Sequence, residues 1–182
     1  MINKINRPTL KNPLQKTIVI ITEKKYEDLE LWYTRIRLEE EGVNVIIAAP
    51  EKIEYEGYYG LKVQPDICIK DVNSKNIDGI IIPGGYAPDF LRRYPEVLSL
   101  VHKLFKENKL VAFICHGGWV PISAEIVKGK HATGLIAIKD DLKNAGAFWE
   151  DKPVVVDQNL ISSRRPDDLP CFCHSIIEFL KK

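Results

Sequence analysis

The sequence predicts an α/β fold with a mostly parallel β-sheet. Short runs rich in isoleucine and valine alternate with stretches of helical character, and this alternation is typical of βαβ units. The predicted strands are residues 17–22, 43–49, 77–82 and Leu110–Ile114. The last run is apolar throughout, as expected of a strand that is covered on both faces of the sheet.

A first helix is predicted between the first two strands. It begins near Glu27 and ends at Gly42, since glycine is common just after the last helical turn. Its apolar face is expected to contain Leu29, Trp32 and Ile36, which recur at helical spacing.

The rest of the chain supplies two more helices, a hairpin and a closing helix. Residues 95–108 begin with a proline and continue with an apolar stripe, and residues 117–127 follow the last parallel strand. Residues 154–162 are expected to form a β-hairpin with its turn at 158–159. The closing helix begins near Pro166, with acidic residues at its start and lysines at its end, as the helix dipole favours.

Length and charge predict one domain without affinity for polyanions. The chain has 182 residues, of which 45% are hydrophobic, and this is enough for one well-buried core. We expect a flexible or partner-wrapping extension at residues 1–16 and one domain at 17–182. Lysine and arginine total 26 against 25 aspartates and glutamates, so no field is expected to attract nucleic acid or a membrane surface.

Cysteine usage favours a reducing compartment. The four cysteines are sparse and irregularly spaced, unlike a disulfide framework. No apolar run approaches the length of a membrane span, and residues 1–16 carry charges and two prolines rather than the apolar core of a signal peptide. We therefore expect a cytoplasmic protein.

The strongest functional signal is the abrupt end of the strand Leu110–Ile114 at Cys115, His116 and two glycines. Such a strand followed by a glycine-rich turn into a helix is typical of a nucleophile elbow. The helix N-terminus would favour a thiolate, and a thiolate attacks carbonyl carbon. The alternative is an inert core cysteine followed by an ordinary loop.

Three loops are expected to converge on this cysteine. The loop at residues 23–27, the pair Gly84 and Gly85, and Cys115 each follow a predicted strand, and sites of open parallel sheets lie beyond the carboxyl ends of the strands. The two glycines would let the backbone approach a ligand closely, although they could also form a simple turn.

Several segments together resemble the ThiJ/PfpI superfamily, specifically its PfpI-type branch, over nearly all of the chain after Lys16. They are Tyr26-Glu27-Asp28-Leu29-Glu30, Pro83-Gly84-Gly85-Tyr86-Ala87-Pro88-Asp89, Ile114-Cys115-His116-Gly117, Ile138-Lys139-Asp140-Asp141, Asn144-Ala145-Gly146, and Ser162-Ser163-Arg164 with Pro166-Asp167-Asp168-Leu169. The resemblance implies a flavodoxin-like, class I glutamine-amidotransferase-like three-layer sandwich. It also implies a homodimer or larger homo-oligomer.

The resemblance also implies roles for individual residues. Cys115 would be the nucleophile with His116 beside it, and Glu27 would be the carboxyl group facing the thiol. The amides of Gly85 and His116 would form an oxyanion hole. Asp89 would approach His116 from a partner subunit.

Two positions depart from the family pattern. The family often has proline where this chain has Gly118, and glutamate where it has Asp89. The shorter aspartate places the third member of a triad in question.

Three functions follow from these residues. The first is cofactor-independent glyoxalase- or deglycase-like hydrolysis of reactive carbonyls or their protein adducts, with Cys115 as nucleophile and Glu27 as proton carrier. The second is a cysteine peptidase that uses Cys115, His116 and Asp89. The third is a redox-sensing or chaperone-like protein in which Cys115 is oxidised. Glu27 could also be a solvated acid in the first helical turn.

The remaining candidates concern binding. Gly84, Tyr86, Trp119 and Arg164 are candidate substrate-binding residues, although both aromatic side chains could serve packing alone and Arg164 could simply pair with nearby aspartates. No cofactor is expected, because the chain lacks dinucleotide- and phosphate-binding glycine motifs. No metal site is expected, since Cys171-Phe172-Cys173-His174 on one helix cannot direct all of its ligands to one ion.

Overall fold

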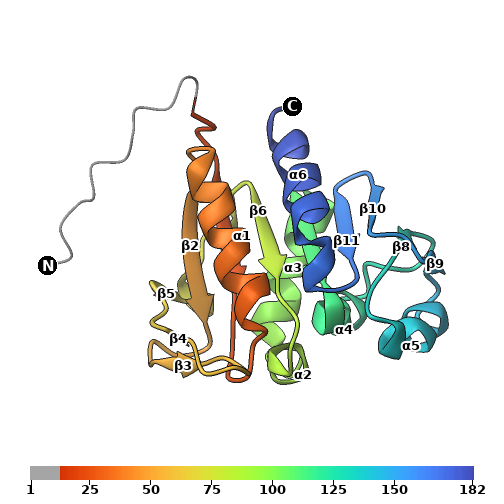
Figure 1. Cartoon of the computed structure of the whole chain (residues 1–182), viewed down its shortest axis with the longest axis horizontal. Helices are drawn as coiled ribbons and strands as arrows, with labels where there is room; N and C mark the ends of the chain where they lie inside the picture. Colours follow the sequence, from red (N-terminus) through yellow and green to blue (C-terminus); the bar gives the residue numbers. More distant parts are fainter. Residues whose placement is uncertain (1–12) are drawn as a thin grey trace, which may run out of the picture.

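The computed structural model describes residues 13–182 and places a seven-stranded sheet between two layers of helices (Figure 1). Most of the predicted N-terminal extension, residues 1–12, lies outside the described residues. Leu14, just before the first strand, donates its N–H to Glu41 O at 2.9 Å.

The central sheet has the order β10-β11-β7-β6-β1-β2-β5, and all its neighbouring strands are parallel except β10 and β11. This confirms the predicted flavodoxin-like α/β sandwich and the hairpin near the C-terminus. The strands are β1 Thr17–Ile21, β2 Asn44–Ala49, β5 Ile67–Cys68, β6 Gly79–Ile82, β7 Leu110–Ile114, β10 Val154–Asp157 and β11 Leu160–Ser163.

Helices cover both faces of this sheet. Helices α1 and α6 pack against each other on one face, and α3 lies on the other (Figure 1). The helices are α1 Asp28–Glu40, α2 Ala87–Leu91, α3 Pro95–Lys106, α4 Trp119–Ser123, α5 Lys139–Asn144 and α6 Leu169–Leu180. Short 3-10 turns lie at Ile69–Asp71, Ser74–Asn76, Cys115–Gly118, Ile136–Ile138 and Pro166–Asp168.

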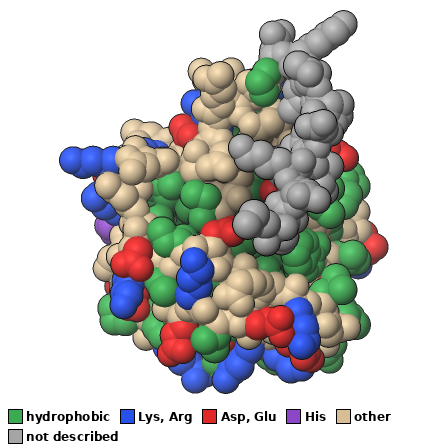
Figure 2. Space-filling model, turned by 90° about the vertical axis from the view of Figure 1, so that its left-hand side faces the viewer, with side chains coloured by type: hydrophobic (Ala, Val, Ile, Leu, Met, Phe, Trp, Pro, Cys, Tyr) green, Lys and Arg blue, Asp and Glu red, His purple; other side chains and the backbone are tan. Residues whose placement is uncertain are grey.

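The structure also contains two small, two-stranded sheets. Strand β3 (Tyr55–Glu56) pairs with β4 (Lys62–Val63) in a hairpin, and β8 (His131–Ala132) pairs with β9 (Phe148–Trp149). Figure 2, which views the molecule from the left-hand side of Figure 1, shows hydrophobic side chains at the surface among charges of both signs. No extended area of one sign is visible on this face.

The predicted helix over residues 117–127 is shorter than expected. A 3-10 turn occupies Cys115–Gly118, and α4 ends at Ser123. Glu125 adopts a left-handed φ of 57°, which a right-handed helix cannot continue through. Ile126 and Val127, which follow, are buried outside any helix, whereas Lys128 and Gly129 are exposed.

The predicted apolar face of α1 is wrong at Leu29 and Ile36 and correct at Trp32, which is partly buried against the core. Leu29 and Ile36 are 56% and 53% exposed, whereas Leu31, Thr34 and Leu38 are buried. The acidic side chains of Asp28 and Glu30 at the start of α1 are buried as well, while apolar side chains lie on its outer face.

Asp28 is one of these acids, and it anchors the hairpin between β3 and β4. Its carboxylate accepts hydrogen bonds from the N–H groups of Tyr59 at 2.8 Å and Leu61 at 2.7 Å. The Asp28 carboxylate is nearly closed to solvent, since this residue is 2% exposed. A buried carboxylate thus holds a turn whose own side chains are exposed.

Candidate active site

Cys115 occupies a strained turn directly after β7. Its φ is 59°, a left-handed conformation that is uncommon for a residue with a side chain. Such a conformation costs on the order of 1–3 kcal/mol and tends to occur at functional sites. Gly117 makes the turn possible, because a Cβ there would lie 2.3 Å from Ile82 O. The chain therefore has the strand, sharp turn and short helix of a nucleophile elbow.

Two loops bring backbone N–H groups to the sulfur. The amides of His116 and Gly85 are directed at the Cys115 thiol. Gly85 has a φ of 74°, and it pairs with Tyr26 in an isolated β-bridge. This bridge fixes the loop after β6 against the loop after β1.

The carboxyl group beside the thiol belongs to Glu30. Its Oε2 accepts the Gly84 N–H at 2.6 Å, and the residue is fully buried. A Cβ built on Gly84 would lie 2.7 Å from Cys115 Cβ and 2.8 Å from Glu30 Oε2. The side chains of Cys115 and Glu30 therefore both lie against Gly84, and only a glycine at this position leaves room for them.

Glu27 does not face the thiol, so that prediction is wrong. Its carboxylate caps α1, with Oε2 accepting the N–H of Glu30 at 2.7 Å. Glu30 lies three residues after Glu27, and the first turn of α1 directs the side chain of Glu30 toward the sheet. The prediction selected the correct segment but the wrong acid, because the rotation of α1 that buries Glu30 depends on contacts outside this segment.

Burial controls the protonation of this pair. Burial raises the pKa of Glu30 to about 8, and the Gly84 N–H partly opposes this by favouring the carboxylate. Burial also raises the pKa of the Cys115 thiol, and the neighbouring Glu30 carboxylate adds to the effect. The prediction of a lowered thiol pKa is therefore wrong, since burial outweighs the amides of His116 and Gly85.

His116 lies against the sulfur despite being the next residue in the chain. Its Nδ1 is 3.5 Å from Cys115 Sγ, because the left-handed turn brings adjacent side chains together. Burial lowers the pKa of His116, so the imidazole is neutral at pH 7 and able to accept a proton.

Trp119 packs against the imidazole of His116. The two rings are 4.9 Å apart between centroids. The indole N–H donates to Asp141 Oδ2 at 2.8 Å, and the guanidinium of Arg92 lies 5.9 Å from the indole ring. Trp119 therefore packs beside the site in a fixed orientation.

The other predicted residues lie farther from the sulfur chemistry. Asp89 forms an ion pair with Arg93 of its own chain, and none of the carboxylates that the structure describes hydrogen-bonds to His116. Tyr86 is exposed, and its ring is 5.9 Å from that of Tyr58. Within residues 13–182, no cluster of metal-binding side chains occurs and no helix is long and apolar enough to cross a membrane.

Fold and site together define a class of protein: an α/β sandwich with a cysteine at the nucleophile elbow and a buried carboxyl group beside it. The sequence profile of the DJ-1/PfpI family matches residues 16–179. The chain belongs to the DJ-1/PfpI family.

Relatives of similar length support this assignment. The chain is 41% identical over 164 residues to Deglycase PfpI of Pyrococcus furiosus, which covers 90% of this chain and 99% of that protein. It is 39% identical over 170 residues to YraA of Bacillus subtilis, whose name assigns it provisionally to the cysteine proteases, covering 92% and 100%. Both names describe the relatives, and they suggest enzymatic activity in this family.

Solved structures show the same fold. A two-domain protein of Anabaena variabilis with DJ-1/ThiJ/PfpI-like and ferritin-like domains matches with a TM-score of 0.90 and 38% identity, covering 92% of this chain and 48% of that one. DJ-1 of Schizosaccharomyces pombe matches with a TM-score of 0.82 and 20% identity, covering 89% and 90%. The second likeness concerns the fold alone.

Proposed function

We propose that this chain is a cytoplasmic, cofactor-independent cysteine enzyme that hydrolyses reactive dicarbonyl compounds or their adducts on proteins, as a protection against carbonyl stress. The observation that carries the proposal is the buried Glu30 carboxyl beside the Cys115 thiol. A carboxyl group with a pKa of about 8 can both give and take a proton near neutral pH. Isomerisation of a dicarbonyl needs that pair of steps.

The first step joins the substrate to sulfur. The neutral imidazole of His116 takes the thiol proton as Sγ attacks the aldehyde carbon, and the carbonyl π electrons move to oxygen. The amides of Gly85 and His116 stabilise the developing negative charge. The oxygen then receives the proton from the imidazolium, which gives a hemithioacetal.

The second step moves a proton between adjacent carbons. The ionised fraction of Glu30 takes the proton from the carbon bonded to sulfur, and the electron pair moves onto the oxygen of the neighbouring carbonyl, which gives an enediolate. Protonated Glu30 returns the proton to that neighbouring carbon, and the hydroxyl proton on the sulfur-bearing carbon passes to the enediolate oxygen, which leaves a thioester of a 2-hydroxy acid. Water cleaves the thioester, releases the acid and restores the Cys115 thiol.

Assays on the purified full-length protein test this proposal. We expect conversion of methylglyoxal to lactate, complete loss of conversion in Cys115→Ala, and unchanged conversion in Cys171→Ala, where the cysteine is exposed on α6. Thermal melts establish that each variant is folded. No conversion by the wild-type protein, or full activity in Cys115→Ala, would overturn the proposal.

Peptide hydrolysis is the second candidate, favoured by the 3.5 Å contact between His116 and Cys115. Asp89 pairs with Arg93 of its own chain rather than with His116. We propose that, in a homodimer or larger homo-oligomer, Asp89 of a second copy leaves this exposed ion pair and orients His116. Such a dimer would contain two composite sites.

Mixing two inactive variants tests this arrangement. Cys115→Ala and Asp89→Ala would each fail to hydrolyse a denatured protein substrate, and hybrids reassembled from both would regain activity at one site. An Asp89→Ala protein that stays fully active on that substrate would remove Asp89 from the mechanism. If subunit exchange restores no activity, Asp89 acts within its own chain.

A further inference from the structure

His116 takes the thiol proton in the mechanism above, yet no carboxylate among residues 13–182 hydrogen-bonds to its ring. Its Nδ1 lies 3.5 Å from Cys115 Sγ. The χ2 torsion of a histidine has only broad preferences, so packing must select the ring orientation that directs Nδ1 at the sulfur. A base that activates a nucleophile is usually held in this way by a third group. The aromatic ring in contact with the imidazole belongs to Trp119.

Trp119 is itself fixed by two neighbours. It begins α4, and its ring centroid lies 4.9 Å from that of His116, with the ring planes at 44°. The indole N–H donates to Asp141 Oδ2 at 2.8 Å. The Arg92 guanidinium lies 5.9 Å from the indole ring, and its Nε donates to Ser123 Oγ at 2.9 Å. The position of the indole is therefore set by groups that do not take part in the reaction.

Asp141 belongs to a side lobe, which we define as residues 131–151 and which includes β8, α5 and β9 (Figure 1). The side lobe contacts the elbow at two further points. The Leu135 N–H donates to Cys115 O at 3.4 Å, and a Cβ built on Gly118 would lie 2.7 Å from Ile138 Cδ1. Asp141 therefore holds the indole from a segment that already lies against the strained turn.

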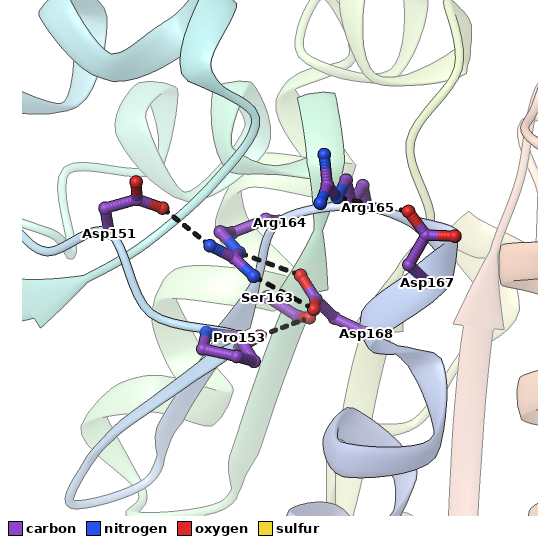
Figure 3. Close-up of polar contacts among 7 residues, drawn as sticks. All are labelled: Asp151, Pro153, Ser163, Arg164, Arg165, Asp167 and Asp168. Atoms are coloured by element: carbon purple, nitrogen blue, oxygen red, sulfur yellow. Dashed lines mark hydrogen bonds and ion pairs between the residues drawn. The ribbon is translucent and has the colours of Figure 1, made fainter.

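The side lobe is attached to the core at both of its ends. Near its start, the Thr133 N–H donates to the buried Ser162 Oγ at 2.9 Å. At its end, Asp151 accepts from Arg164 Nη1 at 2.7 Å, while Nε and Nη2 of this arginine donate to Asp168 at 2.9 and 3.1 Å (Figure 3). Arg164, a candidate substrate-binding residue, thus has these donors bonded to protein carboxylates. Its contacts join the side lobe to the start of α6.

We propose that Trp119 is a positioning residue that keeps His116 Nδ1 directed at the Cys115 sulfur, and that Asp141 acts through Trp119 by fixing the indole. An indole suits this role, because its broad apolar face restricts rotation of the imidazole while its N–H fixes its own orientation. The effect on turnover rests on the proposed function. The orientation of the imidazole is a property of the folded chain, so it can be tested without substrate.

The test follows the reaction of Cys115 with iodoacetamide at neutral pH in the full chain, with peptide mass mapping to separate this cysteine from the others. An imidazole directed at the sulfur takes the thiol proton and so increases the reactive thiolate. We expect Trp119→Ala and Asp141→Ala to slow the reaction at least about tenfold, since a small displacement of a positioned group is costly. Asp141→Asn keeps an oxygen acceptor for the indole and should restore most of the rate.

Asp140→Ala is the matched control, because Asp140 is an exposed acid in the same first turn of α5. It should react at the parental rate. The loss in Trp119→Ala should disappear when it is introduced into His116→Ala, because the proposed role acts through His116. A loss that persists in that background, or an Asp141→Ala protein that reacts at the parental rate, would overturn the proposal. Thermal melts establish that each variant is folded, and the exposed Asp141 supplies variants that decide the matter if Trp119→Ala does not fold.

Turnover separates this proposal from the proposed function. On methylglyoxal, Asp141→Ala should lower kcat and leave KM unchanged, because the orientation of His116 affects the proton transfer rather than substrate binding. A wild-type protein that fails to convert methylglyoxal, while its variants show the expected pattern with iodoacetamide, would refute the proposed function and leave the positioning role standing. Conversion of methylglyoxal at equal rates by wild-type protein and Asp141→Ala would refute the positioning role alone.

Discussion

Helices α1 and α3 both carry acids in their first turn, but only α1 buries acidic and polar side chains beside its apolar ones. In α3, Glu96 points to solvent while Val97, Val101 and Leu104 are fully buried. In α1, Glu30 is fully buried together with Thr34, and apolar Leu29 and Ile36 face solvent. Helix α3 follows the ordinary amphipathic pattern and stabilises the sheet. Helix α1 breaks that pattern because it delivers an acid to Cys115.

The largest expected difference between these helices is in catalysis. Glu30→Gln should lower the rate of methylglyoxal conversion by about 10²–10⁴-fold, because an amide cannot relay the proton. Its carbonyl oxygen can still accept the Gly84 N–H. Glu96→Gln on α3 should keep the wild-type rate. Steady-state kinetics that show equal rates for the two variants would place the proton transfer elsewhere.

For the free energy of unfolding, α3 is expected to be more sensitive than α1 when an apolar side chain is shortened. Leu104→Ala on α3 should lower the free energy of unfolding by about 2–5 kcal/mol, since it opens a cavity in the core. Leu29→Ala on α1 should change it by less than about 0.5 kcal/mol, because the side chain is exposed. Urea unfolding measures both. Similar losses would mean that the outer face of α1 is covered in solution.

Glu30 should also make stability depend on pH. Its pKa is about 8 in the folded protein against 4.5 for an ordinary glutamate, so the folded state binds the proton more tightly. The resulting stabilisation is full below pH 4.5 and is lost as pH rises toward 8. Unfolding free energies measured from pH 5 to 9 should fall relative to those of Glu30→Gln by a few kcal/mol, on the order set by such shifts. Parallel curves for the two proteins would contradict a buried, protonated carboxyl group.

The smallest effect concerns the start of α1. Glu27→Ala should lower stability by about 0.5–2 kcal/mol through loss of the helix cap. Glu27→Asn should restore most of that stability, because asparagine is a favoured capping residue, and it should keep the rate. An inactive but stable Glu27→Asn protein would return Glu27 to the catalytic machinery.

The fold was predictable because its signals are local. The isoleucine- and valine-rich runs identified β1, β2, β6 and β7, and the glycine-rich end of β7 identified the elbow at Cys115. The convergence of the loops after β1, β6 and β7 follows from the rule that parallel strands end at one edge.

The choice between Glu27 and Glu30 was not local. Both lie at the start of α1, and the rotation of the helix depends on the burial of Asp28 and on packing against α6, which no spacing within the segment reveals. The raised thiol pKa was missed for the same reason. A helix N-terminus can be read from sequence, whereas the depth of burial at Cys115 depends on the whole assembly of loops around it.

The anchoring of the β3–β4 turn by Asp28 has a consequence for hydrogen exchange. Amides in an exposed turn normally exchange with deuterated water quickly, but those of Tyr59 and Leu61 donate to a buried carboxylate. Their exchange should therefore require α1 to separate from the turn, at a rate that reports the opening of the helix carrying Glu30. Two surface amides would thus record, residue by residue, how often the wall of the thiol site opens.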